Sequence, residues 1–140
     1  MASNAFAGVG ALFQRSSMAG TPVFSTIAEV NSISLPNMSR GTHDVTSLDS
    51  TGGYKEFIGG FRDSGEVKID LNFTEIGYND LMEDFQTDSL IDYQIILPDT
   101  GATTLGFSAV CTAVGGTIPT DGKVTASATF KISGPVTLTT

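Results

Sequence analysis

The sequence predicts a mainly β domain, a small barrel or sandwich of antiparallel strands flanked by one helix. Several segments alternate apolar and polar residues with the two-residue period of a half-buried strand. One segment repeats apolar residues at the spacing of an amphipathic helix, and turns rich in Gly and Pro separate the elements. With 140 residues, 40% of them hydrophobic, the chain is long and apolar enough to build one domain with a core.

The first 22 residues are expected to form an arm outside the compact domain, which then spans residues 23–140. The arm is rich in Gly and Ala, carries one charge at Arg15, and ends in a Gly-Thr-Pro sequence. The domain begins with residues 23–35, where apolar and polar residues interleave as in a strand, either regular or bulged. Pro36 ends this strand.

Residues 37–64 are expected to form a long, mostly irregular loop with one strand-like piece at 43–48. The loop is rich in Gly, Ser, Thr and Asp. Loops longer than about 12 to 15 residues are uncommon in compact domains, and they usually carry function or become ordered on binding. This loop is therefore the first place to look for function, and its apolar residues are Tyr54, Phe57, Ile58 and Phe61.

Residues 66–74 predict a half-buried strand because every second side chain is apolar. An amphipathic helix follows directly after this strand, and the opposite side of the helix is polar and acidic. The residues at helical spacing on its apolar face are Tyr78, Leu81, Met82 and Phe85. It is the one helix that the sequence supports convincingly.

The second half of the chain predicts three more strands. Residues 90–97 and 103–113 form a hairpin, and Gly101 in the turn between them allows a positive φ. After a loop at 115–122, residues 123–132 again alternate between apolar and polar side chains, which predicts the last strand. A Gly-Pro pair ends that strand and leaves a short Thr-rich tail.

Composition excludes several classes of protein. Fifteen acidic and seven basic residues give a net charge of -8, which disfavours binding to nucleic acid phosphates. Cys111 is the single cysteine, so the chain forms no internal disulfide or thiolate cluster; a small buried side chain in a reducing compartment is expected. No apolar run approaches the roughly 20 residues that span a membrane, so neither a signal peptide nor an anchor is expected.

Asp99 carries the sharpest chemical motif. Asp-Thr-Gly after an apolar strand is how dimeric, retroviral-type aspartic proteases present one carboxylate of their catalytic pair. However, Pro98 precedes it, and the strands on both sides place Asp99 at the exposed tip of a hairpin. An ordinary turn is the favoured interpretation, and a protease that uses Asp99 is the less favoured alternative.

Other candidate sites are weaker. The lone histidine, His43, is best interpreted as a surface or contact residue of the long loop. No phosphate cradle is supported at Gly8-x-Gly10 or Gly59-Gly60, because neither follows a strand and opens a helix. A run of acids lacks the pattern of a calcium loop and is interpreted as a solvated helix face; it comprises Asp80, Glu83, Asp84, Asp88 and Asp92. The sequence thus predicts no catalytic residue, metal site or cofactor.

The order and spacing of these features resemble the lambda-type tail tube proteins of long-tailed bacteriophages. The resemblance covers most of the chain, and no single motif in it is specific. It includes the helix with Leu81 and Phe85 and the strand 67–73 before it. The other matching segments are Ile27-Ala28-Glu29-Val30, Asp44-Val45-Thr46-Ser47, Phe57-Ile58-Gly59-Gly60-Phe61 with Asp63, Tyr93-Gln94-Ile95-Ile96, and the final strand 124–134.

The resemblance implies a split barrel of two packed antiparallel sheets with one flanking helix. It implies a structural virion protein, not an enzyme, that assembles as stacked hexameric rings into the conduit for DNA ejection. Implied partners are other copies, the tail tip or baseplate, the tape measure and the terminator, with no membrane and no cofactor. The protein would be made in the host bacterial cytoplasm and located in the phage tail. An adaptor or terminator that stops at one ring shares this fold and is an alternative.

The resemblance also implies which residues act in assembly. The arm and the long loop of such proteins become ordered in the tube, which would bury the candidate subunit contacts Phe6, Leu12, Phe13, Tyr54, Phe57, Ile58 and Phe61. A lumen lined by acidic side chains would let DNA slide without sticking. Asp70 and Asp92, on the polar faces of their strands, are the candidates for that lining.

Overall fold

The computed structural model describes residues 5–16, 23–27 and 29–140. Within them the protein is mainly β, with one α-helix, α1 (Glu75–Gln86). A short 3-10 turn, η1, spans Thr51–Gly53. The strands are β1 (Leu12–Ser16), β2 (Phe24–Thr26), β3 (Val30–Ile33), β4 (Ser39–Asp44), β5 (Phe57–Asp63), β6 (Glu66–Asn72), β7 (Ile91–Ile96), β8 (Thr104–Thr117), β9 (Thr125–Ile132) and β10 (Thr137–Thr139).

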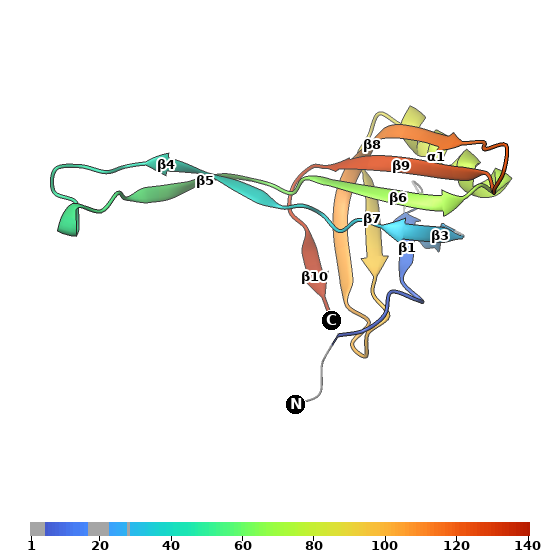
Figure 1. Ribbon diagram of the computed structural model, residues 1–140, viewed down its shortest axis with the longest axis horizontal. Helices are drawn as coiled ribbons and strands as arrows, with labels where there is room; N and C mark the ends of the chain where they lie inside the picture. Colours follow the sequence, from blue (N-terminus) through green and yellow to red (C-terminus); the bar gives the residue numbers. More distant parts are fainter. Residues whose placement is uncertain (1–4, 17–22, 28) are drawn as a thin grey trace.

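Two antiparallel sheets form, as Figure 1 shows. The larger has the order β2-β1-β7-β8-β9-β6-β3, with β10 paired to β8, and the smaller is the β4-β5 hairpin. The long strand β8 belongs to both halves of the larger sheet: its first half pairs with β7 and β10, and its second half pairs with β9. The halves cross in Figure 1 and enclose a core between them. The prediction of a mainly β fold with one flanking helix is confirmed.

Aromatic rings from three strands fill the centre of the core. Phe13, Tyr93 and Phe130 are fully buried, with ring centroids 5.6 Å (Phe13–Tyr93), 5.4 Å (Phe13–Phe130) and 4.6 Å (Tyr93–Phe130) apart. Around them pack the alternating inward residues of β6, β7 and β9, as their two-residue period predicts. Cys111 is also buried, and burial raises its pKa to about 11, so its thiol stays protonated at neutral pH.

The segment around Phe13 is not part of an external arm, contrary to the sequence prediction. Leu12–Ser16 forms β1, which lies between β2 and β7 in the larger sheet. The rest of the predicted arm at residues 1–4 and 17–22 lies outside the described residues. A strand of this length, flanked by Gly and Ala, is too short to show an alternating apolar pattern in the sequence. It becomes recognisable only through its pairing with β7.

Helix α1 forms where it was predicted, but its buried face is rotated. Thr74 caps the helix by accepting a hydrogen bond from Gly77 N at 3.1 Å. The buried residues are Gly77, Leu81 and Asp84, whereas Met82 is 43% and Phe85 52% exposed. Two residues predicted on the apolar face therefore point outward, because Asp84 occupies an inward position.

Asp84 was predicted on a solvated face, but it is buried, with 1% of its surface exposed. Its carboxylate accepts hydrogen bonds from Arg15 Nε, at 3.1 and 3.0 Å, and from the Tyr93 hydroxyl at 3.0 Å, and it forms an ion pair with the Arg15 guanidinium. The bond to Asp84 raises the pKa of Arg15, and burial followed by the Asp84 charge raises that of Tyr93. This cluster ties β1 to the helix and to the core.

Three other boundaries differ from the sequence prediction. The first strand divides into β2 and β3, and between them Glu29 adopts a positive φ of 58°. Strand β8 continues to Thr117, into the loop expected from residue 115. The Thr-rich tail contributes β10, which pairs with the start of β8.

Candidate assembly surface

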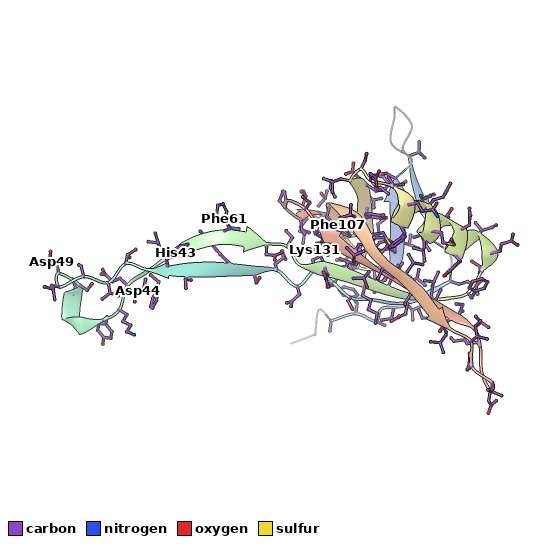
Figure 2. The ribbon with its side chains drawn as sticks, turned by 90° about the horizontal axis from the view of Figure 1, so that it is seen from above. His43, Asp44, Asp49, Phe61, Phe107 and Lys131 are labelled. Carbon is purple, nitrogen blue, oxygen red and sulfur yellow. The ribbon has the colours of Figure 1, made fainter. Side chains whose placement is uncertain are left out.

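Residues 37–64 were expected to be a mostly irregular loop, and this was wrong. Strands β4 and β5 pair in antiparallel register from Ser39–Asp63 to Asp44–Phe57, with a shift between Arg40 and Thr42. Figures 1 and 2 show this hairpin projecting far from the barrel. The many glycines and hydroxyl residues of this segment give it no alternating apolar pattern, so the sequence does not predict the strands. The strands form because they pair with each other.

The far end of the hairpin is closed by local hydrogen bonds. Asp44 Oδ1 accepts from Thr46 N at 2.8 Å, and Thr46 Oγ1 accepts from Glu56 N at 2.7 Å. Hydrogen bonds to Thr46 lower the pKa of the Asp44 carboxyl. Gly52 and Gly53 have φ values of 68° and 73°, which permit the turn around η1. The end of the hairpin is therefore a defined turn.

The hairpin base is fixed to the barrel. Asp63 Oδ1 accepts from Gly65 N at 2.8 Å and from Lys131 Nζ at 3.0 Å, and these contacts lower the pKa of Asp63. Ser64 Oγ donates to Gly134 O at 2.6 Å. Gly65 has a φ of 79°, and a Cβ there would overlap the backbone of Asn37. The base thus sets the direction in which the hairpin points.

Two glycines in β5 make room for long side chains of β4. A Cβ at Gly59 would overlap the guanidinium of Arg40, which donates from Nε to Gly60 O at 3.1 Å. A Cβ at Gly60 would lie 2.9 Å from Nε2 of His43. The Gly59-Gly60 pair therefore serves packing across the hairpin, with Arg40 over one glycine and His43 against the next.

The hairpin exposes most of its large apolar side chains. Phe61 is 97% exposed, and Figure 2 shows it on the projecting hairpin. Tyr54, Phe57 and Ile58 are also exposed. A two-stranded ribbon has no second layer in which to bury them, and isolated hairpins are marginally stable in water. Several large apolar side chains exposed on one projecting element are typical of a protein interface.

The candidate contacts near the N-terminus divide into two groups. Phe6 and Leu12 are exposed. Phe13 is fully buried inside its own domain, so its prediction as a subunit contact was wrong. Its ring packs on Tyr93 and Phe130, which leaves no surface for a second copy.

Asp70 and Asp92, the candidate lumen residues, lie on the outward side of the larger sheet. Asp70 alternates with the buried Ile69 and Leu71 on β6, and it is half-buried. Asp92 is exposed on β7 and accepts a hydrogen bond from Ser108 Oγ at 2.5 Å. Both carboxylates therefore face away from the core.

Asp99 closes the turn between β7 and β8. Its carboxylate accepts from Thr103 N at 2.7 Å and from Thr103 Oγ1 at 2.6 Å, and these bonds lower the pKa of Asp99. Ala102 N also donates to its carbonyl at 3.1 Å. A paired catalytic carboxylate would instead need to share a proton with a second carboxylate.

The residues that the structure describes hold no group of three or more His, Cys, Asp or Glu side chains placed to bind a metal ion. Among those same residues, no helix is long and apolar enough to cross a membrane.

The barrel and its hairpin are similar to known tail structures. The protein of an empty gene transfer agent tail, refined with C6 helical symmetry, matches 97% of this chain and 100% of its own, with a TM-score of 0.78 and 22% identity. A sheath/tube terminator of an extracellular contractile injection system covers 100% of both chains, with a TM-score of 0.73 and 14% identity. The SPP1 tail tube gives a TM-score of 0.65 with 10% identity over 91% of this chain and 75% of its own.

Sequence comparison gives a more specific result than the fold. No curated protein sequence matches the chain significantly. The family model of the lambda phage tail tube protein, however, matches residues 8–139. That match includes the barrel, the helix and the projecting hairpin. The chain therefore belongs to the lambda phage tail tube protein family and is a structural component of a virion tail.

Proposed function

We propose that this protein polymerises as stacked hexameric rings into the tail tube through which DNA is ejected. The observation that carries the proposal is the projecting hairpin, whose apolar residues are left exposed by every described part of their own chain. Other copies supply a second layer and bury Tyr54, Phe57, Ile58 and Phe61. Family membership supports the role, and the C6 symmetry of the similar gene transfer agent tail supports the ring number.

The acidic composition suits a conduit for a polyanion. A net charge of -8 repels DNA, so a lumen lined with carboxylates provides no adhesive contacts. We assign Asp70 and Asp92 to that lining because both lie on the outward side of the sheet. The protein itself carries out no chemical reaction in this role, and DNA passes without specific binding.

The tube also meets other tail proteins at its ends and along its lumen. We propose the tail tip or baseplate at one end, a terminator at the other, and a tape measure protein inside. Phe6 and Leu12, both exposed near the N-terminus, are proposed as further contacts between copies.

Electron microscopy of the purified, concentrated protein, with and without tail-tip complexes as seeds, tests the proposal. Hollow tubes of uniform diameter are the expected result. Persistent monomers in the presence of a competent seed would contradict it.

A terminator that forms a single ring is the second candidate function. The similarity to a sheath/tube terminator favours it, since that chain has the same fold over its full length. The same microscopy separates the two functions, because a terminator yields single rings that do not stack.

Asp99→Asn is expected to leave tube formation unchanged and to lower the melting temperature only slightly. Asparagine retains an oxygen that accepts from Thr103 N, so the turn between β7 and β8 still closes. Tube yield and melting temperature of the variant measure this. If the wild-type protein cleaved peptides and the variant did not, the aspartic protease alternative would replace the proposed role.

A further inference from the structure

The hairpin carries two arginines that face each other without a carboxylate partner. Arg40 on β4 and Arg62 on β5 are direct cross-strand neighbours. Like charges placed opposite each other on a sheet are destabilising. Among the described residues, the ion pairs present are those of Arg15 with Asp80 and Asp84 and of Lys131 with Asp63, so neither hairpin arginine is neutralised within this chain.

An aromatic residue lies on the same side of the hairpin as these arginines. Phe57 and Gly59 are two residues apart on β5 and so share a face, and the Arg40 side chain crosses that face over Gly59. Phe57 is 55% exposed. This side of the hairpin therefore presents a ring and two cations, which we call the basic face (Arg40, Phe57 and Arg62), together with one carboxylate, Asp44, opposite Phe57 at its far end. It suits a partner surface that combines apolar and acidic side chains.

The outward side of helix α1 has the complementary character. Between Lys68 and Lys123 the chain contains no basic residue, so the helix lies in a wholly acidic stretch. Glu75, Met82 and Glu83 are exposed and lie at i, i+7 and i+8 in α1, so they share the side opposite the buried Gly77, Leu81 and Asp84. We call this side the acidic face, and its residues are Glu75, Met82 and Glu83.

The two faces lie at opposite ends of the molecule. In Figure 1 the hairpin projects to one side of the barrel, and α1 lies on the other side, where it packs on β8. The hairpin of one chain therefore cannot reach the helix of the same chain. A contact between two different surfaces at opposite ends joins copies head to tail, so each added copy leaves one basic and one acidic face open.

We infer that the basic face of the hairpin docks on the acidic face of α1 in a second copy. Arg62 and Arg40 donate to Glu83 and Glu75, and Phe57 packs against Met82. This inference rests on the proposed function, because it names the surface at which the hairpin meets its neighbour. It also implies that salt slows tube growth, since the contact brings together charges that are exposed beforehand.

Charge exchange between the two faces tests the inference. Arg62→Glu and Glu83→Arg each place like charges together, so each variant alone is expected to lose at least about tenfold in tube yield. An equimolar mixture of the two variants is expected to recover tubes, because each reversed hairpin then meets a reversed helix. The double variant in one chain is expected to recover as well.

Two control positions lie close to these elements but outside the proposed contact. Lys55→Glu changes a hairpin cation outside the paired strands, and Asp88→Arg changes an acid just beyond α1, so both are expected to form tubes normally. Circular dichroism and gel filtration of each variant check that the monomer folds.

The outcomes distinguish this inference from the proposed function. If the wild-type protein forms tubes and the single variants do so equally well, the docking surface is wrong but the tube function stands. Loss of tubes in both single variants without recovery in the mixture would also overturn the docking. Failure of the wild-type protein to form tubes with a competent seed would instead contradict the proposed function.

Discussion

Asp84→Ala is expected to lower the free energy of unfolding by about 3–5 kcal/mol, which is the usual cost of removing one partner of a buried ion pair. The change leaves the Arg15 guanidinium, whose side chain is 15% exposed, without its buried partner and with only the more distant Asp80, and it removes the hydrogen-bond partner of the Tyr93 hydroxyl inside the core. Urea denaturation followed by circular dichroism measures the loss as a lower midpoint with an unchanged slope.

Asp80→Ala is the matched control, because Asp80 is the other carboxylate near Arg15. Its Oδ1 lies 3.7 Å from Arg15 Nη1, and its side chain is 27% exposed. Solvent screens such a pair, so its removal is expected to cost less than about 1 kcal/mol. Equal losses for the two variants would show that the buried geometry of Asp84 is not what stabilises the domain.

Phe57→Asp is expected to abolish tube growth while the monomer stays folded. Phe57 is 55% exposed and makes no contribution to the buried core, so the barrel does not depend on it. In the assembled tube the new carboxylate would be buried against apolar side chains and beside other acids, at a cost of several kcal/mol at every subunit contact. Electron microscopy and the melting temperature of the variant measure the two effects separately.

Phe57→Tyr is the control for this change, since it keeps the ring and adds no charge. Tubes are expected from this variant at close to the wild-type yield. Normal tubes from Phe57→Asp would mean that the hairpin does not make the contact. A large drop in the melting temperature would mean that Phe57 serves the fold instead.

The regular strands and the helix were predictable because their signals are local. In β6, β7 and β9 every second side chain enters the core, so the two-residue period alone identifies them. The hairpin turn at Asp99 follows likewise from local residue chemistry, and the capping bond from Gly77 N to Thr74 fixes where α1 begins. The sequence also identified the apolar residues of segment 37–64, which are exposed on the projecting hairpin.

Local patterns in the chain predict the β architecture, the single helix, the buried Cys111 and the presence of apolar residues that need a partner. The remaining features emerge only in the folded domain, because they depend on residues far apart in the chain. Phe13 enters the core through pairing with β7, 80 or so positions along the chain. Asp84 turns inward because Arg15, 69 positions away, neutralises it there. The hairpin projects because Lys131 and Gly134 hold its base, and no local pattern records such long-range contacts.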